Sequence, residues 1–232
     1  MKRVFCRLLL VTLAPAFITF LFAGSAFAQK QVRIPYIASE VSPQHFQAHK
    51  FAEEVNKRLP GQFAFRFYPS GQLGPENSWW EQLQLGTMEM GIVVSAAINV
   101  DRKFGIFDLP WLFKNTKNAR SAMTGPLKDK VAQLLEQKSG VKVVGIYDHG
   151  FRHVMSNRAI VKPEDMKGLK IRVAGGRARQ DLFRKLGANP TPIDWTEVFS
   201  ALQTGVVNGA EASIYGLYEA KLHQVCPSLS LT

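Results

Sequence analysis

An arginine near the end of a predicted strand is the residue of this 232-residue sequence best placed for chemistry. Residues 169–173 predict a short strand, and Arg172 stands at its carboxyl end, before two glycines and a predicted helix over residues 177–186. A guanidinium there can donate two parallel hydrogen bonds to a carboxylate. Open α/β sheets bind their ligands at the carboxyl ends of strands. The alternative is a structural ion pair with Glu211 or Asp194, and spacing alone does not decide between the two.

Two pairs of histidines have a spacing that metal sites also use. His45 and His49 are four residues apart on a predicted helix, and His149 and His153 repeat that spacing. No HExxH motif and no cysteine pair accompanies them, so we expect no metal site and no cofactor. The sequence also lacks a GxSxG elbow, a Walker loop and a nucleophile beside a base. We therefore expect no enzyme, with an exported hydrolase of unknown type as the alternative.

The chain is basic, with 29 lysines and arginines against 18 aspartates and glutamates and a formal charge of +11. Part of this charge gathers on one predicted helix, which carries Arg177, Arg179, Arg184 and Lys185. A nucleic-acid surface would have such a cluster. The amino terminus has the pattern of an export signal, described below, so we expect no nucleic-acid partner. We expect instead a solvated basic face that attracts anions towards the protein.

The first 28 residues have the three parts of a secretory signal peptide. Three basic residues precede an apolar stretch over residues 8–22, and residues 26–28 read AFA, a cleavage pattern. We therefore expect residues 1–28 to be removed on export, with an uncleaved membrane anchor as the alternative. Only Cys226 then remains, so we expect no internal disulfide.

Short β-rich runs alternate with helical patterns along the mature chain, which favours an α/β fold with largely parallel sheets. The strand pattern is clearest where phenylalanine occupies every second position of residues 63–68. Asp194 and Glu197 have the spacing of a helix capping box. We expect strands over residues 32–37, 63–68, 90–95, 141–147, 152–156 and 169–173, and helices over residues 42–58, 75–85, 119–138, 177–186 and from residue 197 onward.

Several short motifs follow one another over most of the mature chain. Residues 68–74 read YPSGQLG, 109–111 LPW, 156–158 SNR, 165–173 DMKGLKIRV, 186–190 LGANP and 197–209 EVFSALQTGVVNG. In this order the motifs closely resemble those of the solute-binding protein family of TRAP transporters, the DctP type. The resemblance covers residues 32–225.

The resemblance implies a periplasmic-binding-protein-like α/β fold, in which two domains, residues 29–149 and 150–232, are joined by a hinge around a ligand cleft. It implies a monomeric periplasmic protein that captures a small organic acid without altering it. Such a protein delivers its ligand to the membrane permease subunits of a transporter driven by an ion gradient.

The resemblance also implies ligand-binding roles for four residues. Arg172 lies in the KIRV motif, whose arginine pairs with the ligand carboxylate in the family. Arg152 corresponds to a second arginine that lines the cleft, and Trp195 to an aromatic residue that flanks the ligand. Glu211 stands in the motif that contacts ligand, or serves to orient an arginine.

This sequence departs from the family in two ways. Where the family commonly has an asparagine that contacts ligand, the chain has Ala212, and Ile37 and Val94 stand where sugar-acid-binding relatives place polar groups. We therefore expect a less polar pocket, for a simpler or more apolar carboxylate. The family also continues for several dozen residues beyond Thr232, so we expect the C-terminal part of the second domain to be missing and apolar faces to be exposed. A non-functional fragment is the alternative.

Overall fold

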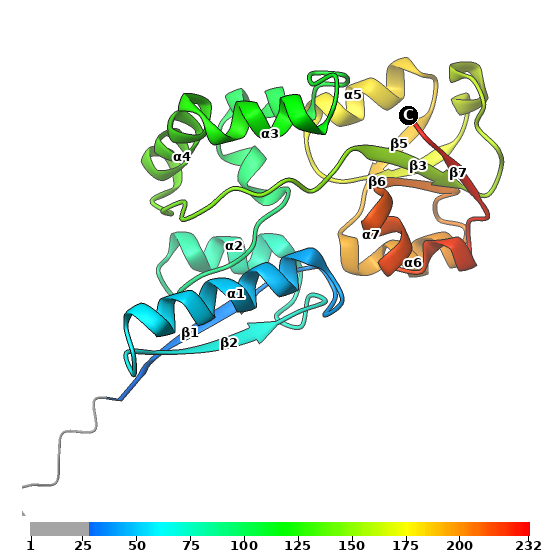
Figure 1. Ribbon diagram of the computed structural model, residues 1–232. Helices are drawn as coiled ribbons and strands as arrows, with labels where there is room; N and C mark the ends of the chain where they lie inside the picture. Colours follow the sequence, from blue (N-terminus) through cyan, green and yellow to red (C-terminus); the bar gives the residue numbers. More distant parts are fainter. Residues whose placement is uncertain (1–27) are drawn as a thin grey trace, which may run out of the picture.

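The computed structural model describes residues 28–232, which fold around two β-sheets (Figure 1). The smaller sheet pairs β1 with β2, and the larger sheet has the strand order β5-β4-β6-β3-β7. The predicted signal peptide lies outside the described residues, except for its last residue. Over residues 28–232, no helix combines the length and the apolar character that crossing a membrane requires.

Most of the α-helices and four of the seven strands lie where the sequence predicts them, whereas β5, β6 and β7 were not predicted. The strands are β1 (Lys30–Pro35), β2 (Phe63–Tyr68), β3 (Arg152–Ser156), β4 (Lys170–Val173), β5 (Asn189–Pro192), β6 (Gly209–Ser213) and β7 (Ser228–Ser230). The α-helices are α1 (Pro43–Arg58), α2 (Glu76–Gln84), α3 (Thr116–Thr124), α4 (Pro126–Ser139), α5 (Arg177–Lys185), α6 (Val198–Gln203) and α7 (Ile214–Glu219). Short 3₁₀ helices include η1 (Ala96–Val100), η2 (Arg102–Asp108), η3 (Pro163–Met166), η4 (Trp195–Glu197) and η5 (Leu222–Gln224).

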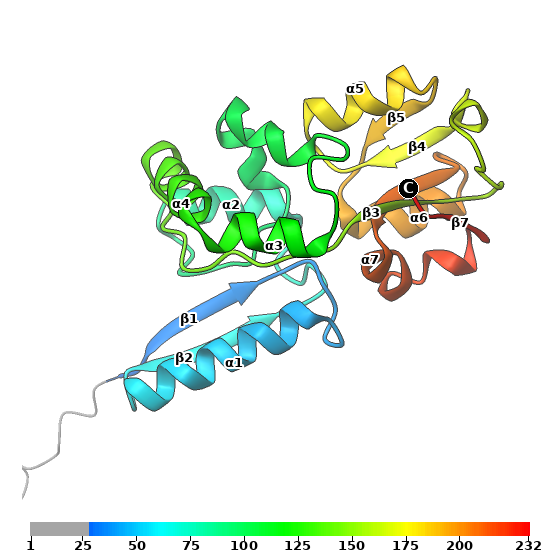
Figure 2. The same cartoon turned by 45° about the horizontal axis from the view of Figure 1, so that its top comes forward.

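The smaller sheet is covered by α1, which lies along it in Figure 2. β1 and β2 are parallel, and Ile34 is opposite Phe67. The hydroxyl of Ser42 accepts the amide proton of His45 at 3.0 Å, and Pro43 occupies the first turn, where a missing amide proton costs nothing. These two signals fix the start of the helix and thereby the path of the chain after β1.

The larger sheet is mixed and is covered on both faces. β4 is parallel to β5 and β6, whereas β3 is antiparallel to β6 and β7, so the expectation of parallel pairing holds for only part of this sheet. Figure 1 shows α5 on one face and α6 and α7 on the other. Ile171 and Phe183 belong to the core cluster that includes α5, and Val198 and Leu217 to the cluster around α6 and α7. All five residues of β6, the central strand, are buried.

Two predicted strands are absent from the described chain. The run over residues 90–95 makes one backbone hydrogen bond to β1, from Ile92 N–H to the carbonyl of Pro35 at 3.0 Å. The run over residues 141–147 makes no backbone hydrogen bond to any other described segment. The prediction of strands there is wrong because an apolar run becomes a strand only where a neighbouring backbone completes its ladder.

Two predicted helical features also differ. The helix predicted over residues 119–138 is divided into α3 and α4, because Gly125 is extended (φ −101°) and Pro126 has no amide proton to continue the hydrogen-bond pattern. The predicted capping box is not formed. The amide of Glu197 bonds the main-chain oxygen of Asp194 at 3.0 Å, and no side-chain cap bond is present.

The segment after β1 touches α7 across the middle of the molecule. The hydroxyl of Tyr215 donates to the carbonyl of Val41 at 2.5 Å, and the amide of Ser39 donates to the carboxylate of Glu219 at 3.0 Å. These contacts join residues that are more than 170 positions apart in sequence. The two sheets lie on either side of residue 150, and their movement as two lobes divided at that residue stays a prediction.

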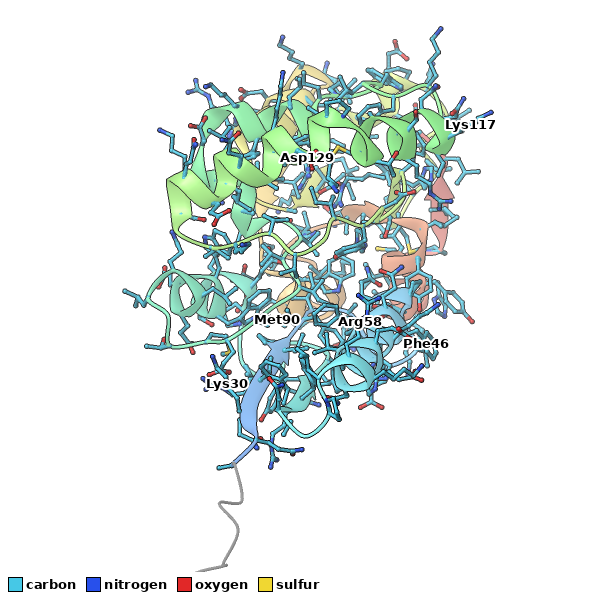
Figure 3. All side chains as sticks on the ribbon, turned by 60° about the vertical axis from the view of Figure 1, so that its left-hand side comes forward. Lys30, Phe46, Arg58, Met90, Lys117 and Asp129 are labelled. Atoms are coloured by element: carbon cyan, nitrogen blue, oxygen red, sulfur yellow. The ribbon has the colours of Figure 1, made fainter. Side chains whose placement is uncertain are left out.

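Some large apolar side chains face solvent. Trp111 is 78% exposed and Val144 is 68% exposed. Phe46, labelled in Figure 3, lies at the edge of the molecule on α1 and is 63% exposed.

Candidate functional site

Arg172 is a buried cation at the carboxyl end of β4, with 4% of its surface exposed. Its Nε donates to the carbonyl of Ile193 at 2.9 Å, and its guanidinium carbon lies 5.1 Å from the centre of the Trp195 ring. Nη1 makes a long contact of 3.5 Å with the main-chain oxygen of Glu211. No carboxylate oxygen of the described residues lies within 4.0 Å of Arg172, so the ion pair with Glu211 or Asp194 that the sequence left open is not formed.

The electrostatic environment of Arg172 is unfavourable for its charge. Burial lowers the pKa of its guanidinium to about 10, and the nearby charges of Arg152 and Arg179 act in the same direction. Glu211 opposes them. Because a pKa near 10 still leaves the group protonated at neutral pH, β4 presents a buried positive charge that an anion would stabilise.

Glu211 holds the other arginines of the site in place. Its side chain on β6 is 3% exposed and forms ion pairs with Arg152 of β3 and, at 3.7 Å, with Arg179 of α5. It also accepts the amide proton of Ala174 at 2.9 Å. Burial raises the pKa of Glu211, but the two arginines more than offset this effect and hold the pKa below its usual value. Glu211 is therefore an ionised carboxylate that orients arginines.

Arg179 belongs to this network, and its prediction as part of a solvated basic face is wrong. It is 7% exposed and forms an ion pair with Asp108, the last residue of η2. It lies four residues before Phe183, which is also buried, so both side chains are on the inner face of α5. Gly176 precedes this helix with φ +114°, and a side chain there would collide with Asp108.

A small cavity of about 40 Å³ adjoins Arg172 and Trp195. Of the predicted site residues, Arg152, Arg172 and Trp195 line it, while Glu211 does not. A water molecule occupies about 30 Å³ of liquid, so an organic acid can enter only if the walls move apart. The cavity is lined by Ile37, Ala38, Val94, Ser95, His149, Arg152, Arg172, Ala174, Trp195, Ala212, Gly216 and Glu219.

A second hollow, of about 1750 Å³, is much larger but is a weaker candidate for an anion site. It shares Val94, Ser95, His149 and Arg152 with the small cavity and is otherwise lined mainly by apolar residues from both halves of the chain. In Figure 3 the layer of α3 and α4, which carries Lys117 and Asp129, lies apart from the layer of α1 and β1. Arg172 does not reach this hollow, and Arg152 there is already paired with Glu211. We therefore place the candidate site in the small cavity.

His149 lies in the wall of the small cavity as a neutral side chain. Its Nδ1 is 2.6 Å from Nε2 of Gln44, and its Nε2 is 3.4 Å from the hydroxyl of Ser213. Burial lowers the pKa of His149 to about 4, and the charge of Arg152 adds to this effect. At neutral pH the imidazole therefore contributes a hydrogen-bonding group and no charge.

This lowered pKa predicts a loss of stability in acid. An unfolded histidine takes up its proton near pH 6.5, whereas His149 in the folded chain does so only near pH 4. Acid therefore favours the unfolded chain, and between these pH values the free energy of unfolding should fall by about 2 kcal/mol more in the wild type than in His149→Gln. Urea titrations of both proteins at pH 7 and pH 4 measure this difference. Equal losses of unfolding free energy in the two proteins would show that the pKa of His149 is not lowered in the folded chain.

The first predicted histidine pair, His45 and His49, packs against neighbouring aromatic side chains. The rings of His45 and His49 are 4.3 Å apart, His45 Nδ1 bonds the hydroxyl of Tyr36 at 2.7 Å, and His49 stacks on Phe67. Within residues 28–232, no group of three or more histidine, cysteine, aspartate or glutamate side chains is arranged to hold a metal ion.

The chain is similar to one family of bacterial proteins over most of its length. The family described as bacterial extracellular solute-binding protein, family 7 (DctP), matches residues 34–232. The 2,3-diketo-L-gulonate-binding periplasmic protein YiaO of Escherichia coli is 32% identical over 213 residues, which are 91% of this chain and 65% of YiaO. The chain thus spans less than two thirds of that relative's length.

Two solved structures have the same fold over most of this chain. The sugar acid binding protein DctPAm from Advenella mimigardefordensis, in complex with galactonate, has a TM-score of 0.83 and 31% identity and covers 88% of this chain and 66% of its own. A TRAP periplasmic solute-binding protein from Sulfurospirillum deleyianum, with bound succinate, has a TM-score of 0.82 and 28% identity, with coverage of 87% and 66%. The predicted fold class and family resemblance are confirmed, and the matched family consists of solute-binding proteins and not of hydrolases.

Proposed function

Because the chain belongs to family 7 of the bacterial extracellular solute-binding proteins, the DctP family, we propose that it binds a small organic acid through Arg172. The acid would be delivered, chemically unchanged, to the membrane permease subunits of a TRAP transporter. The protein would act as a monomer in the periplasm, since its relative YiaO is named a periplasmic protein. Residues 1–28 would direct its export.

The uncompensated guanidinium of Arg172 carries this proposal. Three buried or half-buried arginines, at positions 152, 172 and 179, face two buried carboxylates, those of Asp108 and Glu211. The positive charge of Arg172 therefore lacks a partner, and we expect the carboxylate of the ligand to be that partner. A charge-assisted, two-pronged hydrogen bond in a buried site is among the strongest polar contacts available to a protein.

Three apolar side chains of the lining favour an acid of limited polarity. Ile37, Val94 and Ala212 all line the cavity and offer no side-chain hydrogen bonds. A ligand rich in hydroxyl groups would leave several of them without partners there, which costs free energy. The relatives include proteins of known structure with galactonate and with succinate bound, so acids of both kinds belong in a screen.

Closure around the ligand would couple binding to recognition by the permease. The cavity is lined by residues 37, 38, 94 and 95 on one side and by residues of β3, β4, β6 and α7 on the other. A carboxylate that contacts both sides favours the closed arrangement by its differential affinity for the two states.

Isothermal titration calorimetry of the chain with small carboxylates tests the proposal. We expect a single saturable site for at least one acid, no heat with the matching amide, and the unmodified acid on recovery. The amide is the control because it keeps the shape of the acid and loses the charge. The proposal would be contradicted if the acid and its amide bound with equal affinity, or if none of the acids bound.

A further inference from the structure

Glu219 is a carboxylate in the wall of the candidate cavity that has no cationic partner. It is the last residue of α7, and its side chain is half-buried. Among the described residues, no lysine, arginine or histidine nitrogen lies within 4.0 Å of its carboxylate. The cavity therefore contains an unpaired negative charge as well as the unpaired positive charge of Arg172.

The contacts of Glu219 leave each oxygen able to accept a further hydrogen bond. Oε1 accepts the amide proton of Ser39 at 3.0 Å, and Oε2 accepts its hydroxyl proton at 3.2 Å. The hydroxyl of Tyr215 is also within hydrogen-bond reach of this carboxylate, and it donates to the carbonyl of Val41 at 2.5 Å. A carboxylate oxygen has two acceptor positions, so Glu219 remains a free acceptor towards the cavity.

The surroundings cannot neutralise a second ligand carboxylate beside Glu219. The side chains that line the cavity with it include Ile37, Ala38 and Ala174, which are apolar, and Arg152, whose charge is already paired with Glu211. Two carboxylates close together in a site of low dielectric repel each other, whereas a hydroxyl or ammonium group gains a charge-assisted hydrogen bond.

Given the proposed carboxylate site at Arg172, we propose that Glu219 makes the cavity selective for monocarboxylates whose far end carries a hydrogen-bond donor. The carboxylate of the ligand binds Arg172, and its donor, a hydroxyl or an ammonium group, binds Glu219. Dicarboxylates are rejected because their second carboxylate meets the charge of Glu219. The cavity would thus contact both ends of the ligand, the carboxylate through Arg172 and the donor group through Glu219.

Four acids with a four-carbon chain test this assignment by calorimetry: butanoate, 4-hydroxybutanoate, 4-aminobutanoate and succinate. The wild-type chain should bind 4-hydroxybutanoate or 4-aminobutanoate roughly tenfold more tightly than butanoate, and succinate most weakly. The two donor ligands distinguish a hydroxyl preference from an ammonium preference. In Glu219→Gln, the affinity ratio of succinate to the preferred donor ligand should rise roughly tenfold or more.

Glu219→Gln preserves the shape of the side chain and can still form a hydrogen bond with Ser39. A change in the affinity ratio of succinate to the donor ligand is therefore due to the lost charge. Glu164→Gln removes the same charge from the exposed 3₁₀ helix η3, outside the cavity, and should leave the ratio unchanged. Equal wild-type affinities for succinate and 4-hydroxybutanoate, or a ratio that Glu219→Gln does not move, would overturn the inference and leave the role of Arg172 intact. Binding of these acids that is insensitive to Arg172→Ala would overturn the proposed function as well.

Discussion

Replacement of Arg172 by alanine is expected to lower the affinity for the organic acid by roughly a hundredfold or more. The substitution removes a buried cation that has no carboxylate partner among the described residues, together with the ring contact to Trp195. Arg152 cannot replace it, because its charge is paired with Glu211. Calorimetric titration of wild type and variant with the same acid measures the loss.

Two further variants separate the role of the planar guanidinium from that of charge alone. Arg172→Lys should recover only part of the affinity, because an ammonium group lacks the fork of parallel donors. Arg177→Ala removes an arginine whose side chain is 89% exposed and should leave the affinity unchanged. Unchanged affinity in Arg172→Ala would remove Arg172 from the site.

Glu211→Gln is expected to lower the free energy of unfolding by roughly 3 kcal/mol or more. Glutamine has the same shape but no charge, so Arg152, Arg172 and Arg179 would share the core with Asp108 as the only carboxylate of the network. Breaking a buried ion pair costs this much because the remaining charges stay buried without compensation. Urea unfolding followed by circular dichroism measures the change.

A second substitution tests whether uncompensated charge causes this loss. Glu211→Gln combined with Arg152→Met removes one charge of each sign and should recover part of the stability of Glu211→Gln. Glu164→Gln, on the exposed helix η3, serves as the matched control and should cost less than about 0.5 kcal/mol. A loss in Glu211→Gln as small as that of the control would show that the network contributes little.

The predicted elements of the second sheet agree with the structure because their signals are local. β4 is a short run in which three buried residues follow the exposed Lys170, and the glycines before α5 and after it mark both ends of that helix. Arg152, Arg172, Trp195 and Glu211 were identified because each lies in a short motif. The structure brings all four together, although Glu211 lies behind the cavity and not in its wall.

The groups that the sequence did not reveal depend on partners far away in the chain. Arg179 bonds Asp108 across 71 residues, and Glu219 bonds Ser39 across 180 residues. Neither spacing has a local pattern that predicts it. The sequence signal that would have placed Arg179 on an inner face is the apolar residue four positions later, Phe183, which is buried on the same face of α5. The prediction of strands over residues 90–95 and 141–147 was wrong for a related reason. A strand forms only where backbone from another part of the chain provides hydrogen-bond partners, and the sequence of the run itself does not show this.

A crystal structure of the chain with a bound acid tests the central claim most directly. The account predicts both carboxylate oxygens of the ligand within hydrogen-bond distance of the Arg172 guanidinium, with Trp195 still packed against that group. An acid bound elsewhere, while Arg172 faces solvent or pairs with Glu211 or Asp194, would contradict it.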